Sequence, residues 1–390
     1  LEGGGGLVFG FAGVFGDECV ELRDAGGLSR LDRRGYFTGF VGKYMNGYGI
    51  ERPAEQPRGW DRWAALTLHS EYRMWGYTLN EDGSLRRYGY ATRDYQTDVL
   101  ARKAAGMIRV GASRRNPFFV ALSPVAPHTE DPSVVGANAP RNPRPAPRHR
   151  GDYAGKPMPR APSFNERNIN DKPRFFRGAH KRRLSNSEKR DLRREYRSRI
   201  ESLQAVDDAV KKLIRTLRRE RELKRTVFVF TSDNGLLLGE HRDSGKGSFY
   251  EESTRVPLAI RGPGFPRGVA RHQVVGNIDL APTFIDLAGG GVARLDGVPL
   301  GPLARNPSAG AGRGIVLERS SQEGRAYKAI REGRWVYVDH RGPFPEMYDL
   351  VRDPYQLRNV ARLPRYRDER RHLKRRLERL RDCRAAACRR

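Results

Sequence analysis

Two short, mainly apolar runs constrain the fold of this chain more than any other feature of its sequence. Pro117–Leu122 reads PFFVAL and Thr226–Phe230 reads TVFVF, and a polar loop follows each run. Short runs rich in aromatic and β-branched residues are typical of strands buried on both faces of a parallel sheet. Further strands are expected at Gly35–Val41 and at Val256–Ile260, where the turn RGPG ends the last one.

Segments with helical periodicity alternate with these strands. Apolar residues recur at helical spacing in Tyr95–Val110, and more strongly from Leu192 to Leu217, where Arg and Lys occupy the outer face. Ile278–Leu287 predicts a third helix with Pro282 near its first turn. This alternation of strand, loop and helix predicts an α/β fold with a mainly parallel sheet.

The remaining segments depart from this pattern. Leu1–Gly27 is Gly-rich without a clear period, and residues 132–191 predict a long insertion in which APRNPRPAPRHR is extended and exposed. After residue 310, short strands with tight turns predict a small antiparallel sheet, and a leucine stripe predicts a basic helix over Arg365–Arg381. We therefore expect a large α/β domain over residues 1–310 and a small domain over residues 311–390.

The charge balance excludes an acidic protein. The 390 residues contain Lys+Arg 74 and Asp+Glu 46, a formal net charge of +28, which suits polyanionic partners such as nucleic acid, sulfated polysaccharide or anionic lipid. The 16 Tyr, 16 Phe and 4 Trp are enough to form a core, so the charge does not indicate disorder. No apolar run approaches the ~18–20 residues that cross a bilayer.

The cysteines indicate little metal chemistry. The sequence contains Cys19, Cys383 and Cys388, without a CxxC pair or an HExxH motif, so neither a structural zinc site nor a zinc protease is expected. The last two cysteines either form a disulfide, which would indicate an oxidising compartment, or are free thiols on a frayed end.

Polar residues follow the expected strands, where the chemistry of open α/β sheets collects. Lys43, His128 and the pair Asp233–Asn234 follow strands, and Lys246 lies in a later loop. The carboxylate and amide oxygens suit Ca²⁺ or Mg²⁺, the lysines an oxyanion, and the histidine proton transfer. Each residue also has a structural interpretation: Asp-Asn-Gly is a common turn, and lysines and loop histidines are commonly surface residues. Their joint placement at strand ends favours a site.

Several segments, taken together, resemble the type I sulfatases. They occur in the family's order from Gly35 to the C-terminus: GYFTGFVGKYMNGYG, PFFVALSPVAPHTE, PSFNE, RSRIESLQAVDDAV, TVFVFTSDNGLLLGEHRDSGKGSFYEESTRVPLAIRGPG and VVGNIDLAPTFIDLAG. The GKYMNGYG form is most similar to the branch with glucosamine-6-sulfatases, extracellular heparan endosulfatases and bacterial arylsulfatases. The resemblance implies an alkaline-phosphatase-like α/β sandwich with a small C-terminal sheet and helix. It also implies hydrolysis of the sulfate ester of a sugar or aryl alcohol, and a secreted or periplasmic location.

The resemblance assigns roles residue by residue. Asp233 and Asn234 match the family's late pair of calcium ligands. Lys43 matches the lysine that contacts the sulfate and the nucleophile, and Lys246 matches the second sulfate-binding lysine. His128 matches the histidine that contacts the sulfate and protonates the leaving oxygen. Met45 stands where many sulfatases have a further histidine, and His241 receives no role.

The sequence departs from the family at two motifs. Family members open with a strand and an Asp-Asp pair that completes the calcium site, and then carry C-x-P-S-R, whose Cys or Ser becomes the formylglycine nucleophile; neither occurs here. Cys19 begins CVELR, which lacks the Pro and Ser and lies too close to Lys43, so it is not expected to be the nucleophile. We therefore expect a missing N-terminal strand, an unpaired edge inside the sheet, an incomplete Ca²⁺ site, and little or no activity of this chain alone.

Two other functions remain open at this point. A phosphate- or phosphonate-ester hydrolase of the same fold would bind a similar anion with the same lysines. A non-catalytic protein could instead bind polyanions through the basic faces of residues 180–225 and 365–390, although a solvated basic surface is the simpler interpretation of those faces. No helix-turn-helix, RNA-recognition or zinc-finger signature occurs, so the expected partner is a sulfated small molecule or glycan rather than a specific nucleic acid.

Overall fold

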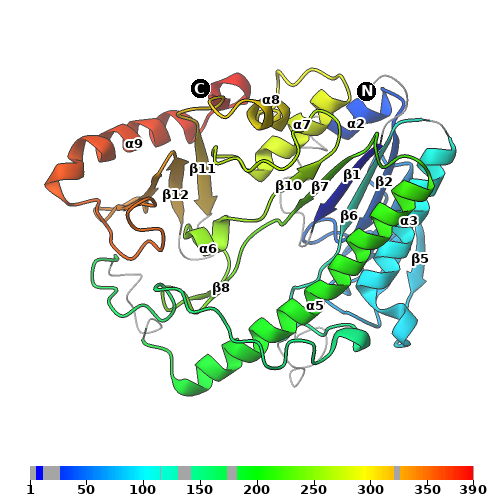
Figure 1. Cartoon of the computed structure of the whole chain (residues 1–390), viewed down its shortest axis with the longest axis horizontal. Coiled ribbons are helices and arrows are strands. Elements are labelled where there is room, and N and C mark those ends of the chain that lie inside the picture. The colour runs from blue at the N-terminus through cyan, green and yellow to red at the C-terminus, as the bar shows by residue number, and fades with distance from the viewer. Residues whose placement is uncertain are drawn as a thin grey trace.

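A computed structural model of the chain describes residues 6–11, 27–114, 116–130, 142–173, 182–319 and 326–389. Its centre is an eight-stranded sheet in the order β10-β7-β1-β6-β2-β3-β4-β5 (Figure 1). The strands are β1 (Gly6–Phe11), β2 (Phe37–Gly42), β3 (Arg62–Thr67), β4 (Thr78–Glu81), β5 (Ser84–Arg87), β6 (Phe118–Ser123), β7 (Val227–Thr231) and β10 (Ala259–Arg261). The neighbours from β7 to β3 run parallel, and the outer pairs are antiparallel, so the mainly parallel sheet is confirmed.

The expected gap in this sheet is absent. Gly6–Phe11 forms β1, which lies between β6 and β7 and pairs with both in parallel. The prediction of a missing N-terminal strand and of an unpaired internal edge was therefore wrong. The glycine-interrupted sequence GLVFGF did not indicate a strand. The two neighbouring strands supply its backbone hydrogen-bond partners, and such pairing does not depend on the side chains.

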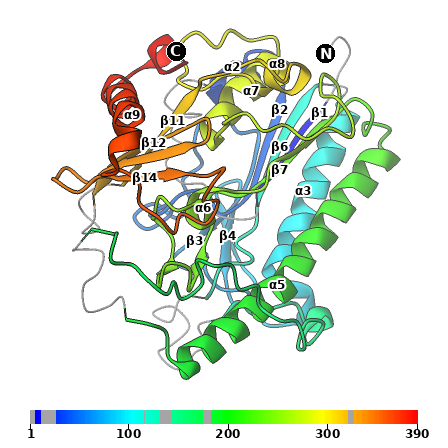
Figure 2. The same ribbon diagram turned by 60° about the vertical axis from the view of Figure 1, so that its left-hand side comes forward.

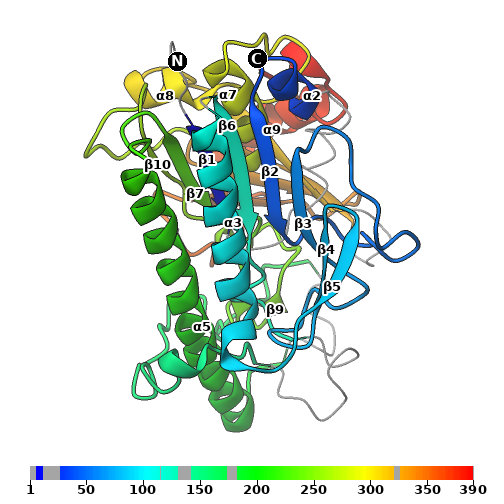
Figure 3. The same cartoon turned by 90° about the vertical axis from the view of Figure 1, so that its right-hand side faces the viewer.

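Helices cover both faces of the sheet. The helices are α2 (Gly27–Asp32), α3 (Gln96–Ser113), α5 (Asn186–Arg219), α6 (Glu251–Thr254), α7 (Leu280–Leu287), α8 (Leu300–Arg305) and α9 (Arg367–Leu380). The two long helices α3 and α5 lie side by side on one face (Figure 3), and α2, α7 and α8 lie on the other. The helices predicted in Tyr95–Val110, Leu192–Leu217 and Ile278–Leu287 are all present.

The side chains of β6 explain this sandwich. Successive strand residues point to opposite faces, so Val120 and Leu122 pack with the residues of α3 and α5, whereas Phe119 and Ala121 pack with α7 and α8. All six residues of β6 are buried, as expected for a strand covered on both faces. A capping box begins α5, in which the Ser185 side chain accepts from the Glu188 backbone.

The prediction that the segment APRNPRPAPRHR (residues 139–150) is extended and exposed was only partly correct. Ala139–Arg141 lies outside the described residues, but Ala146 is fully buried. Arg144 forms an ion pair with the buried Glu130, and Arg148 pairs with Asp98 of α3. Carboxylates elsewhere in the sequence therefore hold this Arg-Pro-rich stretch against the domain. The expectation of exposure was wrong for Pro143 and Ala146, which are buried, whereas Pro147, Arg148 and Arg150 are exposed.

The C-terminal part forms the small antiparallel sheet that the sequence predicts. Its order is β11-β12-β13-β14, with β11 (Gly314–Arg319), β12 (Tyr327–Glu332), β13 (Trp335–Asp339) and β14 (Glu346–Asp349). The leucine stripe of α9 packs on one face of this sheet, and the other face packs against residues that follow β7. Figure 2 shows α9 on the outer side and α6 toward the central sheet. The division of the chain at residue 310 stays a prediction.

The C-terminal part contains a disulfide and accepts hydrogen bonds from a buried lysine earlier in the chain. Cys383 and Cys388 form a disulfide, which answers the question that the sequence left open. Lys172 has a buried ammonium group that donates to the carbonyl oxygens of Gln356 at 3.0 Å and Leu357 at 2.9 Å. Within the part of the chain that the structure describes, no helix has both the length and the apolar character required to span a bilayer.

Candidate functional site

Lys43 follows β2 at the carboxyl end of the sheet. Its backbone N–H donates to the Ser123 carbonyl at 2.9 Å, which fixes the ends of β2 and β6 together. The preceding Gly42 has φ +118°, and a Cβ there would lie 2.0 Å from the Ser123 oxygen, so this approach requires glycine. The tight junction of two strands thus holds Lys43 in place.

The ammonium group of Lys43 is buried beside polar partners. The residue is 1% exposed, its Nζ donates to Asn46 Oδ1 at 2.8 Å, and it also donates to the Tyr72 hydroxyl. Burial is the main cause that lowers the pKa of Lys43 to about 8; Glu71 opposes this shift and Lys246 adds to it. A buried cation with few partners is suited to receive an anion.

His128 follows β6 in the loop that the sequence predicts. Its Nδ1 donates to the Thr129 carbonyl at 2.6 Å, because a carbonyl only accepts, which leaves Nε2 as the ring atom that can take up or deliver a proton. Burial is the largest effect lowering its pKa to about 4, the bond to Thr129 opposes it, and Lys246, Arg199 and Lys43 lower it further. The imidazole is therefore neutral at pH 7 while no anion is near.

Tyr72 connects Lys43 to His128, and the sequence did not indicate it. The Lys43 Nζ lies 4.1 Å from the centre of the Tyr72 ring, and the His128 ring packs against the same Tyr72 ring at 4.5 Å between centroids. The loop that carries Tyr72 is held by the Met74 backbone N–H, which donates to Glu130 Oε1 at 2.7 Å. These contacts bring three loops to one place.

Asp233 and Asn234 follow β7 in a bend whose backbone is held by hydrogen bonds. The Asn234 N–H donates to Asp233 Oδ1 at 2.8 Å, and Asn277 Nδ2 donates to the Asp233 carbonyl at 3.1 Å. A Cβ on Gly235 would lie 2.2 Å from the Glu252 carbonyl oxygen, so this loop also requires glycine. The local side-chain-to-backbone bonds that the structural interpretation expects are present, and the loop places a carboxylate and an amide oxygen at the sheet edge.

Lys246 lies in the loop after β9 (Ser244–Gly245), which pairs with β8 (Leu237–Leu238). Its exposed Nζ lies 3.4 Å from Asn234 Oδ1. Phe249 and Tyr250 anchor this loop in the core formed with the small C-terminal sheet. Since Lys246 affects the pKa of both Lys43 and His128, the predicted lysines and histidine lie within electrostatic reach of one another.

The described residues provide only part of a calcium site. Ca²⁺ takes about 6–8 oxygen ligands, and Asp233 and Asn234 provide two side-chain oxygens. Elsewhere in the described ranges, no group of three or more His, Cys, Asp or Glu could hold a metal ion. The ammonium of Lys246 also faces the Asn234 oxygen. These donors alone do not fit a calcium ion, so calcium binding stays a prediction.

Met45 and His241, which the family resemblance singled out, lie in or against the packed core rather than in the site. Met45 is partly buried against the core under α7 and α8. His241 is fully buried, its Nδ1 donates to Glu166 Oε2 at 2.8 Å, and its ring stacks on that of Tyr250 at 3.6 Å between centroids. Burial opposes its charge, but Glu166 and Glu252 outweigh this effect and raise the pKa of His241. Cys19 lies outside the described residues.

Family models match nearly the whole described chain. Residues 28–290 match the model described as Sulfatase, and residues 239–383 match that described as N-sulphoglucosamine sulphohydrolase, C-terminal. The N-acetylglucosamine-6-sulfatase of Capra hircus is 32% identical over 371 residues, covering 84% of this chain and 63% of that protein. An arylsulfatase of Volvox carteri is 30% identical over 377 residues, covering 85% and 57%. The chain thus spans less than two thirds of these relatives.

Solved structures share the fold. The structure of BT4656 in complex with its substrate D-glucosamine-2-N,6-O-disulfate has a TM-score of 0.75 at 23% identity and covers 90% of this chain and 80% of that chain. The phosphonate monoester hydrolase SpPMH from Silicibacter pomeroyi has a TM-score of 0.68 at 20% identity, covering 92% and 80%. The expected alkaline-phosphatase-like fold is thereby confirmed.

Proposed function

The chain belongs to the sulfatase family, and on that premise we propose that its strand-end site binds the sulfate group of a sulfate ester. One observation carries the proposal: beyond the larger effect of burial, Lys246 lowers the pKa of Lys43, and both lysines lower the pKa of the His128 imidazole across three loops. Such a cluster, with few counter-charges, is stabilised when an anion binds between its members. A sulfate group offers several oxygens to meet these donors.

Each residue then has a role set by its surroundings. Lys43, held by the strand junction, and Lys246, on the opposite loop, neutralise charge that builds on the sulfate oxygens during hydrolysis. Burial is the main cause of the low pKa of His128, and the nearby cations lower it further. An anion bound among these cations offsets their effect and raises the pKa of the imidazole, whose Nε2 is the atom that can carry the proton. That proton can pass to the leaving oxygen of the alcohol.

The nucleophile is the part that this sequence does not supply. The 390 residues contain no C-x-P-S-R motif from which a formylglycine could be made. We therefore propose that this chain by itself binds sulfate esters and turns them over slowly or not at all. Asp233 and Asn234 are proposed to contribute two ligands to calcium, and no step is assigned to that ion.

We propose a sulfated sugar, rather than an aryl sulfate, as the ligand class. Relatives named N-acetylglucosamine-6-sulfatase support this choice, as does the bound D-glucosamine-2-N,6-O-disulfate in a protein of the same fold. Relatives named as extracellular sulfatases support a location outside the cytoplasm. Phosphonate monoester hydrolases share the fold alone, so an anion of that kind is the rival ligand.

Calorimetric titration with glucosamine 6-sulfate, an aryl sulfate and phenylphosphonate tests the proposal. The sugar sulfate should bind most tightly. Lys43→Met should weaken this binding at least about tenfold, because a hydrogen bond to a charged group contributes at least about 1.5 kcal/mol and about 1.4 kcal/mol corresponds to a factor of ten. Lys224→Met, which removes an exposed lysine from the loop between α5 and β7, is the matched control and should leave the affinity unchanged. Tighter binding of the phosphonate would refute the assignment, and rapid release of sulfate by the chain would refute its predicted inactivity.

A further inference from the structure

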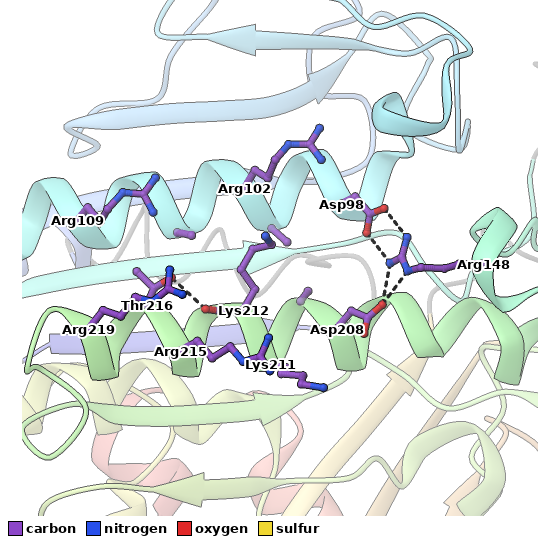
Figure 4. Close-up of a pocket in the computed structure, with 13 residues that line it drawn as sticks. Asp98, Arg102, Arg109, Arg148, Asp208, Lys211, Lys212, Arg215, Thr216 and Arg219 are labelled. Carbon is purple, nitrogen blue, oxygen red and sulfur yellow. Dashed lines mark hydrogen bonds and ion pairs between the residues drawn. The ribbon is translucent and has the colours of Figure 1, made fainter.

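A long groove between α3 and α5 lies apart from the strand-end site. It has a volume of about 640 Å³, and side chains of both helices line it (Figure 4). Because the two helices run side by side on one face of the sheet, the groove follows their length. We call this feature the α3–α5 groove.

The anionic groups of the α3–α5 groove are already neutralised. Its two carboxylates, Asp98 and Asp208, are both bound by Arg148, with N–O distances of 2.7 Å and 2.8 Å. His149 lies 2.9 Å from Asp208 as well. The carboxylates at this end of the groove therefore have little capacity left to balance other cations.

Five further cations of the groove have no such balance. Within the described ranges, their side chains form neither an ion pair nor a hydrogen bond, although all five are exposed: Arg109, Lys211, Lys212, Arg215 and Arg219. Lys211, Arg215 and Arg219 follow one another at four-residue spacing on α5, where like charges destabilise a helix by about 0.2–0.5 kcal/mol per pair. A polyanion seated in the groove would remove this repulsion.

The basic surface continues beyond the α3–α5 groove. Arg102 lines both this groove and a second hollow of about 470 Å³, which Arg86, Arg87 and Lys103 also line. On α5 the unbalanced cations run from Lys211 to Arg219, about 12 Å along the helix at 1.5 Å per residue. Together with the second hollow, they offer more positive charges than a single anion can meet, which suits a polymer with many negative charges.

We propose that the α3–α5 groove is a second binding site, separate from the catalytic one, for a sulfated polysaccharide chain. The lining contains alanine and threonine besides its charged residues, and none of its side chains is aromatic. Proteins that hold single-stranded nucleic acid stack bases on aromatic side chains, so the composition favours a sulfated glycan. The inference rests on the proposed function only in that the polysaccharide is taken to be sulfated.

Fluorescence anisotropy with a labelled heparin decasaccharide tests this inference. The variant Lys212→Gln/Arg215→Gln/Arg219→Gln should bind at least about tenfold more weakly, with a smaller slope of log K against log salt, because fewer counterions are exchanged. The matched control, Arg371→Gln/Arg375→Gln/Arg379→Gln on α9, removes the same charge from exposed positions and should lose no more than about twofold. Thermal unfolding of each variant checks that it is folded.

Further measurements separate this site from the catalytic one. Lys43→Met should leave decasaccharide binding within about twofold, and the groove variant should bind glucosamine 6-sulfate normally, so either proposal can fail alone. Equal losses in the groove and α9 variants would overturn the inference in favour of unspecific charge. Tighter binding of a single-stranded RNA of similar charge would overturn it in favour of nucleic acid.

Discussion

Replacement of Gly42 by alanine tests whether the junction of β2 and β6 positions Lys43. The new Cβ would lie 2.0 Å from the Ser123 carbonyl oxygen, at a φ of +118° that side chains rarely adopt. Relief of this clash requires the two strand ends to separate, which breaks the bond from the Lys43 N–H to Ser123. The substitution therefore moves a site residue without changing any polar side chain.

The magnitude follows from three contributions. The strained φ costs about 1–3 kcal/mol, overpacking against the neighbouring backbone about 1–3 kcal/mol, and the lost hydrogen bond about 1 kcal/mol. Together they predict that Gly42→Ala lowers the free energy of unfolding by about 3–7 kcal/mol. Gly35→Ala is the matched control, because Gly35 also has a positive φ, of +74°, but has no atom within 4 Å of the added Cβ. Its cost is the conformational strain alone, about 1–2 kcal/mol.

Urea denaturation and sulfate-ester calorimetry would measure both consequences. Gly42→Ala should be at least about 2 kcal/mol less stable than Gly35→Ala, and it should bind glucosamine 6-sulfate more weakly while Gly35→Ala binds normally. Equal stability of the two variants would refute the clash. Unchanged binding by a folded Gly42→Ala protein would refute the role of the junction in placing Lys43.

Three further predictions concern titration, metal and a buried ion pair. Since burial lowers the pKa of Lys43 to about 8, affinity for a sulfate ester should fall as the pH rises through 8, and calorimetry at pH 6–10 should find no such fall in Lys43→Met. Calcium should raise the melting temperature by less than about 1 °C, because Asp233 and Asn234 are too few ligands; a rise of several degrees in scanning calorimetry would contradict this. The raised pKa of His241 means that its ion pair with Glu166 stabilises the fold fully below pH about 6.5 and is lost as the pH rises through the folded-state pKa. Glu166→Gln should therefore lose more stability at pH 6 than at pH 9 in urea denaturation, and an equal loss would argue against a charged pair.

The elements that the sequence predicted are those whose side chains alone determine them. The run around Val120 is apolar on both faces and could only be a buried strand, and the long period of α5 requires a single packed stripe. Lys43, His128 and Asp233 could be grouped because the carboxyl ends of parallel strands meet at one edge, whereas Lys246 follows the separate pair of β8 and β9.

The features that the sequence missed depend on partners distant in the chain. Tyr72 reaches Lys43 from a loop that Glu130 holds in place. Glu130 accepts a hydrogen bond from the Met74 backbone of that loop, although the two residues are 56 positions apart in the sequence. The strand β1 has no periodic pattern of its own, and β6 and β7 determine its place. Arg148 appeared solvated in the sequence because its carboxylate partners lie 50 and 60 residues away.

The buried ammonium of Lys172 has a consequence for how this protein can evolve. It links the segment 142–173 to the C-terminal part through the carbonyl oxygens of Gln356 and Leu357, and Glu166 lies 3.5 Å from it. A buried charge that loses its partners costs several kcal/mol, so a C-terminal part from another protein would be tolerated only with matching carbonyl groups. This segment and the C-terminal part are therefore expected to diverge together, as a pair inherited by one lineage, rather than to be exchanged as independent modules.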